Sequence, residues 1–524
     1  MTKTVLLAIT FFIIGNLVVI GLGIANASEQ AKVSARKKMK AVVEYLVDWE
    51  AINKYVMSLE TEEEQNNFYN NEYPYVKRDD VLKMMEGNDH IIAVNLMIKQ
   101  TAYAMDFDVV ELQNQDNNGS ITYDTDVQVS TVDETTYVEP DIFISANAFE
   151  KMIEFEDGTY TLLEGRMYTE QDIIDGNNVV LIETGLAELN NLRVGDKITI
   201  SYMTDYDLSW DAGLKEAFAN YERNYEYEII GIYDNKEVLD PNAEDYNWKS
   251  DFEAPENRIL MPTSTVYTAI GPITAIYNEY WNKSNVSELE PRAIVITDLP
   301  SIDQFYYSNT VFLLDDPLEV QSFVDDNSAN LPQFFKLDAH NEEFKNIARP
   351  LDSITIYTNI FMGIILVAAT VIISLITALT LKNREFEIGI LLAVGVSKVK
   401  VILQMFAEVF IIAILAFLLS IGSGSFLTKA TGNWIRDFQL QFESQYGDTS
   451  DDLYGIAYYT SAWDTDYFSD ITQDELMEGY DASVNPKVIA YTMGVGVLVV
   501  LIATVIPSIL IMRYNPKRIL TNVN

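Results

Sequence analysis

The sequence contains no cysteine and only two histidines, His90 and His340. Without thiols there is no disulfide framework and no thiolate metal site, and two histidines are too few for a histidine-rich zinc site. Basic residues are also scarce, since 35 Lys and Arg stand against 78 Asp and Glu, which gives a formal net charge of −43. A chain this acidic repels phosphate backbones, so we expect no nucleic-acid partner.

A nucleotide-binding motif is missing as well. No Gly-x-x-x-x-Gly-Lys-[Ser/Thr] occurs, so the chain has no P-loop with which to hold ATP phosphates. Two stretches match calcium loops only in part: residues 114–125 lack the first Asp and the last Glu of an EF-hand, and residues 464–475 lack its central ligand and glycine. We interpret the first as a hairpin that turns at Asn118-Gly119 and the second as a solvated acidic loop. We predict no cofactor, no metal ion and no catalytic site.

Four long apolar runs stand out against this acidic background, at residues 4–27, 355–381, 401–427 and 488–512. Each exceeds the roughly 20 residues that a helix needs to cross the hydrocarbon core of a bilayer. Glu408 is the single ionisable residue within them. We therefore predict four transmembrane helices and a multi-pass protein of the cell membrane that contacts lipid. In a bacterium this would be the cytoplasmic membrane.

The charges between the runs predict the orientation. The linker 382–400 carries four basic and two acidic residues, and the tail 513–524 carries three basic residues and no acidic one. Basic residues in short loops mark the cytoplasmic side, so the linker and the tail are expected inside. The block 28–354, with 24 basic and 63 acidic residues, and the block 428–487, with 3 and 12, are then extracytoplasmic.

The block 28–354 mixes strands and helices, which predicts an α+β domain. Near-helical spacing of apolar residues continues from the first run to Leu59, and a matching stretch precedes the second run. We therefore expect helical stalks. Strands are expected at 179–182, 198–200, 225–235, 257–264 and 310–316, a short helix at 186–192, and another helix beginning near Pro317.

The linker between the second and third runs reads "REFEIGILLAVGVSKVKVILQMFAEVF" (384–410). We expect a short helix from Arg384 to Ala393, ended by Gly395 in a left-handed conformation, with Ser397 capping the next helix. Ile388 and Leu391 are expected to be exposed, for a groove in a partner protein. The pattern is equally compatible with a helix that lies on lipid headgroups.

This stretch resembles the signature of the FtsX-like permease domain of MacB-type (type VII) ABC transporters. The resemblance implies that the linker is the coupling helix that docks on an ATPase, carried by Arg384, Glu385, Glu387, Ile388, Gly389, Leu391, Ala393 and Gly395. It further matches Glu408 to an acid in the third span and matches Gly422 and Gly424 to a small-residue packing face. Pro507, Arg513, Pro516 and Leu520 resemble the closing pattern of the family.

Parts of the large outer block resemble the MacB-like periplasmic core, or porter, region: "LEGRMYTEQD" (163–172), "VVLIETGLAELNNLRVGDKITI" (179–200) and "YEIIGIYDN" (227–235). The resemblance implies a non-enzymatic permease subunit with an α+β ectodomain on stalks. A separate ABC ATPase would bind Mg-ATP, a second identical or different permease chain would pair with this one, and a peptide, antibiotic or lipophilic amphiphile would be the substrate. The segment 428–487 is longer than the family's usual turn.

Two other functions stay open on the sequence alone: an FtsX-like regulator of a cell-wall hydrolase, and a membrane-anchored extracellular receptor or enzyme. The first span is also ambiguous, because Ala25-Asn26-Ala27 fits a signal-peptidase site. The uncharged run is, however, longer than the roughly 7–15 residues of a signal-peptide core. We predict an uncleaved helix with its amino terminus inside.

Overall fold

The computed structural model describes residues 2–112, 138–205, 207–209, 211–242, 246, 249–284, 298–306, 309–339, 341–446, 467 and 473–512. The chain divides into two compact units. A helical unit comprises Met1–Met39, Asn341–Ile456 and Asp470–Asn524, and an α+β unit comprises Lys40–His340 and Ala457–Ser469. The predicted closing residues Arg513, Pro516 and Leu520 and the first calcium-like stretch lie outside the described residues, as does most of the second.

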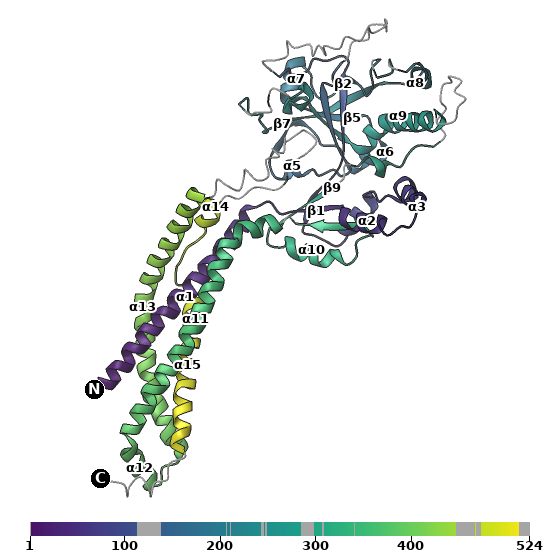
Figure 1. Cartoon of the computed structure of the whole chain (residues 1–524). Coiled ribbons are helices and arrows are strands. Elements are labelled where there is room, and N and C mark those ends of the chain that lie inside the picture. Colours follow the sequence, from purple (N-terminus) through teal and green to yellow (C-terminus); the bar gives the residue numbers. More distant parts are fainter. Residues whose placement is uncertain are drawn as a thin grey trace. The chain divides into compact units, whose positions relative to one another are not determined.

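The helical unit is a bundle built from the four apolar runs (Figure 1). Its helices are α1 (Thr2–Lys38), α11 (Asn341–Asn383), α12 (Glu385–Ala393), α13 (Lys398–Tyr446), α14 (Gln473–Glu478) and α15 (Pro486–Met512). Four of them, α1, α11, α13 and α15, are long and apolar enough to cross a membrane. The four predicted membrane helices are therefore confirmed, and each extends beyond its uncharged run.

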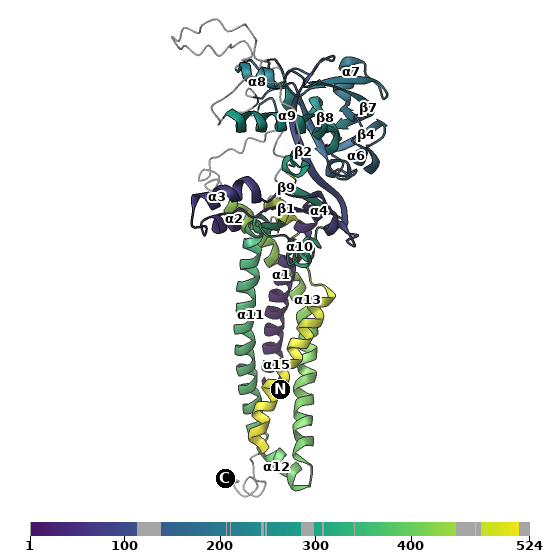
Figure 2. The ribbon, with the colours of Figure 1, turned by 90° about the vertical axis from the view of Figure 1, so that its right-hand side faces the viewer.

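In the bundle, α1 packs against α11, α13 and α15, and α15 also contacts α11 and α13 (Figure 2). The core contains Phe11, Ile373, Phe417 and Val500, each at most 4 % exposed. Small residues allow the helices to approach closely. A Cβ atom on Gly424 would lie 2.8 Å from the Val19 side chain, whereas one on Gly422 would meet open space. The expected packing face thus includes Gly424 but not Gly422.

The first stalk is shorter than predicted. Helix α1 ends at Lys38, and residues that we expected to continue it form β1 (Val42–Val47) and α2 (Trp49–Val56). The apolar spacing of "VVEYLV" fits both a helix and a strand. Pairing with two neighbouring strands decides the outcome, because the sheet buries Val43 and Tyr45 completely.

Ten strands of the described residues form one mixed sheet in the α+β unit. Its order is β10-β1-β9-β2-β3-β8-β5-β7-β4, with β6 paired to β2 and β7. The pairs β3–β8 and β5–β7 are parallel, and the remaining pairs are antiparallel. The strands not yet defined are β2 (Ile91–Ala104), β3 (Ile142–Asn147), β4 (Tyr160–Gly165), β5 (Val179–Glu183), β6 (Lys197–Ser201), β7 (Asn224–Asn235), β8 (Arg258–Pro262), β9 (Asn309–Leu314) and β10 (Phe335–Asp338).

The described part of this unit also contains helices and helical turns. They are α3 (Glu62–Asn67), η1 (Phe68–Glu72), α4 (Arg78–Met85), α5 (Ile153–Glu156), α6 (Glu170–Asp175), α7 (Thr184–Asn190), α8 (Ala212–Ala217), η3 (Asp251–Glu253), η4 (Pro255–Asn257), α9 (Thr263–Ser284), η5 (Ile302–Phe305) and α10 (Val320–Ser328). The predicted strands correspond to β5, β6, β7, β8 and β9, and the predicted helices to α7 and α10. The α+β class is therefore confirmed.

The stretch "LEGRMYTEQD" forms a tight turn whose residues are fixed by their surroundings. Gly165 has a φ of +78°, and a Cβ atom there would lie 2.1 Å from the carbonyl oxygen of Ile230. Thr169 caps α6, and the Nη1 of Arg166 donates to Asp172 at 2.7 Å. Only glycine tolerates that combination of φ and contact, so this part of the motif is structural.

Candidate functional site

The coupling-helix candidate is α12, which lies at one end of the bundle (Figure 2). Its carboxyl end closes as a Schellman motif: the N–H of Val396 donates to the carbonyl of Leu391, and the N–H of Gly395 donates to that of Leu392. Gly395 has a φ of +97°, the left-handed conformation expected from the sequence. The carbonyl of Ser397 accepts the N–H of Val401 and so begins α13.

The exposed face of α12 differs from the prediction. Ile388 is only 2 % exposed and packs with Leu381 and Val401, and Leu391 is half-buried against the same cluster. Our expectation that these two residues are exposed is therefore wrong. The reason is that α12 folds back on the ends of α11 and α13, so that its Ile388 side faces the bundle.

A different apolar face of the same helix is open. Phe386 is 53 % exposed, Ile390 is 44 % exposed and Val394, just after the helix, is 78 % exposed. Among the other candidates, Glu387, Ala393 and Gly395 are exposed, Arg384 and Glu385 are half-buried, and Gly389 is buried. An uninterrupted apolar face with a charged edge is suited to bind a groove of another protein.

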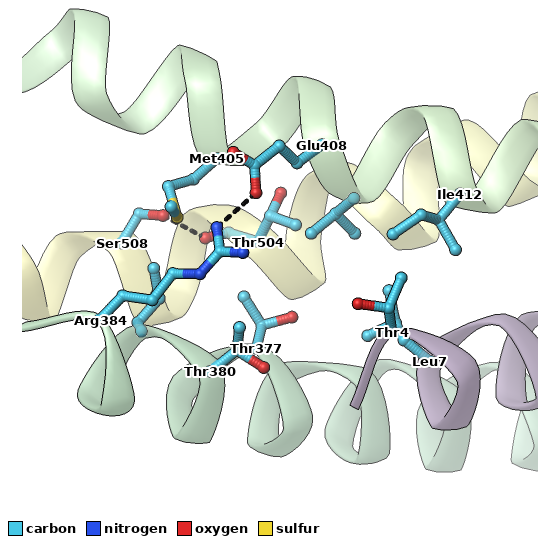
Figure 3. Close-up of a pocket in the computed structure, with 12 residues that line it drawn as sticks. Thr4, Leu7, Thr377, Thr380, Arg384, Met405, Glu408, Ile412, Thr504 and Ser508 are labelled. Atoms are coloured by element: carbon cyan, nitrogen blue, oxygen red, sulfur yellow. Dashed lines mark hydrogen bonds and ion pairs between the residues drawn. The ribbon is translucent and has the colours of Figure 1, made fainter. Parts of the chain in front are cut away.

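Arg384 lies at the bend between α11 and α12, which we call the elbow, and its side chain connects this elbow to α13. Its Nη1 donates to Oε2 of Glu408 at 2.6 Å (Figure 3). A carboxylate within a membrane helix is expected to have a polar or helical partner and to be shielded from lipid. The partner is Arg384, but the side chain is not enclosed, since it keeps 44 % of its surface exposed and that of Arg384 keeps 40 %.

Both charges border a cavity of about 70 Å³ between α1, α11, α13 and α15 (Figure 3). It is lined by Thr4, Leu7, Thr377, Thr380, Leu381, Arg384, Met405, Glu408, Val409, Ile412, Thr504 and Ser508. A water needs roughly 10–15 Å³ of such space, so the cavity has room for a few waters. Thr377 is 4 % exposed, and its hydroxyl has no hydrogen-bond partner among the described residues, which gives such a water one site to bind.

Pro507 explains a further connection near this cavity. A proline within a helix leaves the carbonyl four residues earlier without its N–H partner. Here that carbonyl belongs to Ala503, and it accepts the Ser374 hydroxyl of α11 at 3.2 Å. Sequence reasoning identified Pro507 but not Ser374, because a serine in an apolar run carries no signal for which carbonyl it meets.

The arrangement offers no reaction centre. The polar groups at the cavity are one ion pair and helix-bonded hydroxyls: Thr380, Thr504 and Ser508 donate to carbonyls on their own helices. Among the described residues, no group of three or more His, Asp or Glu could hold a metal ion. The described residues around this cavity thus hold helices in place and include no nucleophile with an adjacent base.

Two family models match most of the chain. The MacB-like periplasmic core domain matches residues 5–295, and the FtsX-like permease C-terminal domain matches residues 359–516. The first alone spans more than half of the sequence. The second includes the elbow, α12 and α13.

One relative matches this chain over nearly the whole length of both proteins. The chain is 24 % identical over 539 residues to "Uncharacterized ABC transporter permease YclI" of Bacillus subtilis (strain 168), covering 99 % of this chain and 96 % of that protein. Among solved structures, the periplasmic region of MacB from Actinobacillus actinomycetemcomitans matches with 10 % identity and a TM-score of 0.27, covering 59 % of this chain and 92 % of that one. The extracellular domain of the noncanonic ABC-type transporter YknZ from Gram-positive bacteria matches with 12 % identity and a TM-score of 0.26, covering 57 % and 99 %.

Proposed function

Because the chain belongs to the ABC transporter permeases with a MacB-like periplasmic core domain and an FtsX-like permease domain, we propose that it couples ATP hydrolysis by a separate ATPase subunit to movement of its ectodomain. The ectodomain is the α+β unit defined above. The ATPase subunit would bind Mg-ATP, since this sequence has no P-loop. The chain itself would do no chemistry.

The observation that carries this proposal is the open apolar face of α12. Phe386, Ile390 and Val394 form it, on the short linker whose charge predicts the cytoplasmic side. Burying such residues in a partner groove is favourable at about 25 cal/mol per Å² of apolar surface. Two fully buried side chains of this size thus supply several kcal/mol toward docking.

The helices beside α12 provide the route for movement. Helix α11 precedes it and α13 follows it, with 43 and 49 residues. At 1.5 Å per residue these helices are about 65 and 74 Å long, at least twice the ~30 Å hydrocarbon core. Helix α11 begins just after β10 of the ectodomain. A displacement of α12 would thus be transmitted out of the membrane by elements that pack along their length.

The finer features of the proposal come from the family. Two permease chains would pair, identical or not, and each would engage an ATPase subunit. The substrate would be a peptide, antibiotic or other amphiphile, handled on the outer side without necessarily crossing the bilayer. The net charge of −43 favours a cationic ligand over an anionic one.

The test is binding of the ATPase to charged variants of α12. Phe386→Glu and Ile390→Glu each place a carboxylate in the proposed interface, where an unpaired buried charge costs several kcal/mol. We expect each variant to insert into the membrane normally and to retain less than about a tenth of the co-purified ATPase.

The matched control is Leu163→Glu, because Leu163 is 53 % exposed on the ectodomain and its variant should bind the ATPase as the wild type does. Binding of the ATPase to both α12 variants at the wild-type yield would refute the docking face. Co-purification of a cell-wall hydrolase instead of an ATPase would support the regulator function.

A further inference from the structure

One residue of the segment between α13 and α14 is part of the ectodomain. Tyr467 is 7 % exposed and packs with Val42, Ala93, Ile153 and Val311. Its recorded hydrogen-bond partners Asn95, Met97 and Glu154 lie 372, 370 and 313 residues earlier in the sequence. Tyr467 is therefore anchored in the α+β unit.

The hydroxyl of Tyr467 completes a buried polar cluster. It donates to Oε1 of Glu154 at 2.9 Å and accepts from Nδ2 of Asn95 at 2.9 Å. Nδ2 of Asn95 also lies 3.0 Å from both carboxylate oxygens of Glu154. Asn95 is 1 % exposed and Glu154 is 5 % exposed, so water does not replace these partners when one of them is removed.

The chemistry of this notch selects a tyrosine. The donors recorded for Glu154 are neutral groups, an amide and a phenol. A buried carboxylate needs its donors, and losing one costs more than an ordinary hydrogen bond contributes. Burial raises the pKa of the Tyr467 phenol well above its usual value, and the nearby charge of Glu154 raises it further. The phenol therefore stays a donor at any physiological pH. A phenylalanine would fill the apolar walls but leave the carboxylate short of a donor.

We propose that the notch of Asn95, Met97 and Glu154 is a docking site for Tyr467, and that this one side chain attaches the chain between α13 and α14 to the α+β unit. This Tyr467 clasp connects the chain beyond α13 to β2 and α5 of the ectodomain. Helix α12 is then joined to the ectodomain on both of its sides, through α11 and β10 and through α13 and the clasp.

Its role in transmitting movement rests on the proposed coupling to an ATPase, but the docking itself does not. The length of the segment follows from this assignment. The segment 428–487 comprises 60 residues, whereas a short turn between two helices has no residue left over to enter the α+β unit.

The docking is tested without any ATPase. A photo-reactive diazirine amino acid in place of Met97 leaves Tyr467 unchanged and can be activated in the full chain in lipid nanodiscs. The Tyr467 hydroxyl lies 3.7 Å from the sulfur of Met97, so we expect a cross-link within one chain to the peptide that contains Tyr467, identified by mass spectrometry. The same amino acid in place of Leu163, which is exposed on the α+β unit, is the control. A Met97 replacement that gives no more of this product than the control would overturn the docking site.

The specificity of the notch is tested by Tyr467→Phe. Hydrogen exchange of the amides in α5 and in β2 near Asn95 should accelerate by about tenfold or more, because the carboxylate loses a donor. Tyr491→Phe, at a side chain 67 % exposed on α15, should leave those amides unchanged. Wild-type exchange in Tyr467→Phe would overturn recognition of the phenol.

Transmission is tested on the complete complex with its ATPase, comparing the nucleotide-free state with a vanadate-trapped state. We expect exchange in α5 and β2 to change on trapping in the wild type and in Tyr491→Phe, and to lose that change in Tyr467→Phe. A change that persists in Tyr467→Phe would overturn the clasp as a route of movement. If the wild type shows no change, the proposed coupling fails, whereas the cross-link still decides the docking.

Discussion

Asp172 shows how much of the ectodomain motif depends on one carboxylate. It accepts hydrogen bonds from Arg166, Asn177 and Thr169, and its side chain is only 8 % exposed. Burial alone would raise its pKa, but these hydrogen bonds outweigh burial and hold the pKa far below the usual value for an aspartate. The folded state therefore binds the proton more weakly than the unfolded state does.

This shift makes a prediction with a definite sign. A lowered folded pKa stabilises the fold above the unfolded pKa of about 3.9, and the stabilisation is lost as the pH falls from there toward the folded value. Asp172→Asn should lower the free energy of unfolding of the ectodomain by roughly 2–3 kcal/mol at pH 7. Thermal unfolding should show a constant difference from the wild type above pH ~5 and a shrinking one below pH ~4.

Glu188→Gln is the matched control, because Glu188 is exposed. An Asp172→Asn protein as stable as the wild type at pH 7 would show that the carboxylate is not what holds the turn.

Single residues also show where sequence reasoning ends. Gly395 was predictable, because a left-handed residue after a helix is almost always glycine. The docking face of α12 was not, since nearly every position from Phe386 to Ala393 is apolar or small and the spacing fits several faces. Which face is open depends on where α11 and α13 end, and that is set by tertiary packing. The partner of Glu408 was foreseeable as a class but not as Arg384.

At the scale of elements, the ion pair between Arg384 and Glu408 braces the elbow. Arg384→Glu would set two carboxylates side by side, and Glu408→Arg would set two guanidinium groups together. Each single reversal should reduce the stability of the bundle by about 1 kcal/mol, since both side chains are partly exposed. The double reversal should recover most of that loss, as measured by thermal unfolding in nanodiscs.

The double reversal is its own control, because it carries both changes and keeps the pair. If it is no more stable than the weaker single variant, the two charges do not act on each other.

Length and apolar content made the bundle helices predictable. The boundary between α1 and β1 was not, because "VVEYLV" fits both periods and the choice depends on strands that lie some 270 residues later, at 309–314 and 335–338.

For the whole molecule, the first span decides the architecture. Helix α1 continues without a break through Ala25-Asn26-Ala27, and both Ala27 and Ser28 are completely buried. Its apolar residues supply a large part of the bundle core. Two of the basic residues that follow are paired, since Lys32 lies 2.9 Å from Asp352 and Lys38 pairs with Glu478. This pairing offsets part of the positive charge just after the first span, which by itself would favour the opposite orientation.

We therefore predict that the mature protein keeps this helix. Removing residues 1–27 would expose the faces of α11, α13 and α15 that pack against it, which is a loss of many buried side chains. Mass spectrometry of the chain extracted from its native membrane should find residues from the 4–27 run. A mature terminus at Ser28 would leave three membrane helices and contradict the four-helix bundle.

If α12 moves as proposed, the length of α11 would enlarge that movement. From Pro350 to Asn383 it runs 34 residues without another proline, a rod of about 50 Å. Pivoted at one end, such a rod converts a tilt of about 10° into a sweep of about 9 Å at the other. A small rotation of α12 would thus become a displacement of several ångströms at the outer end of α11. Shortening α11 by whole turns should reduce that displacement in proportion.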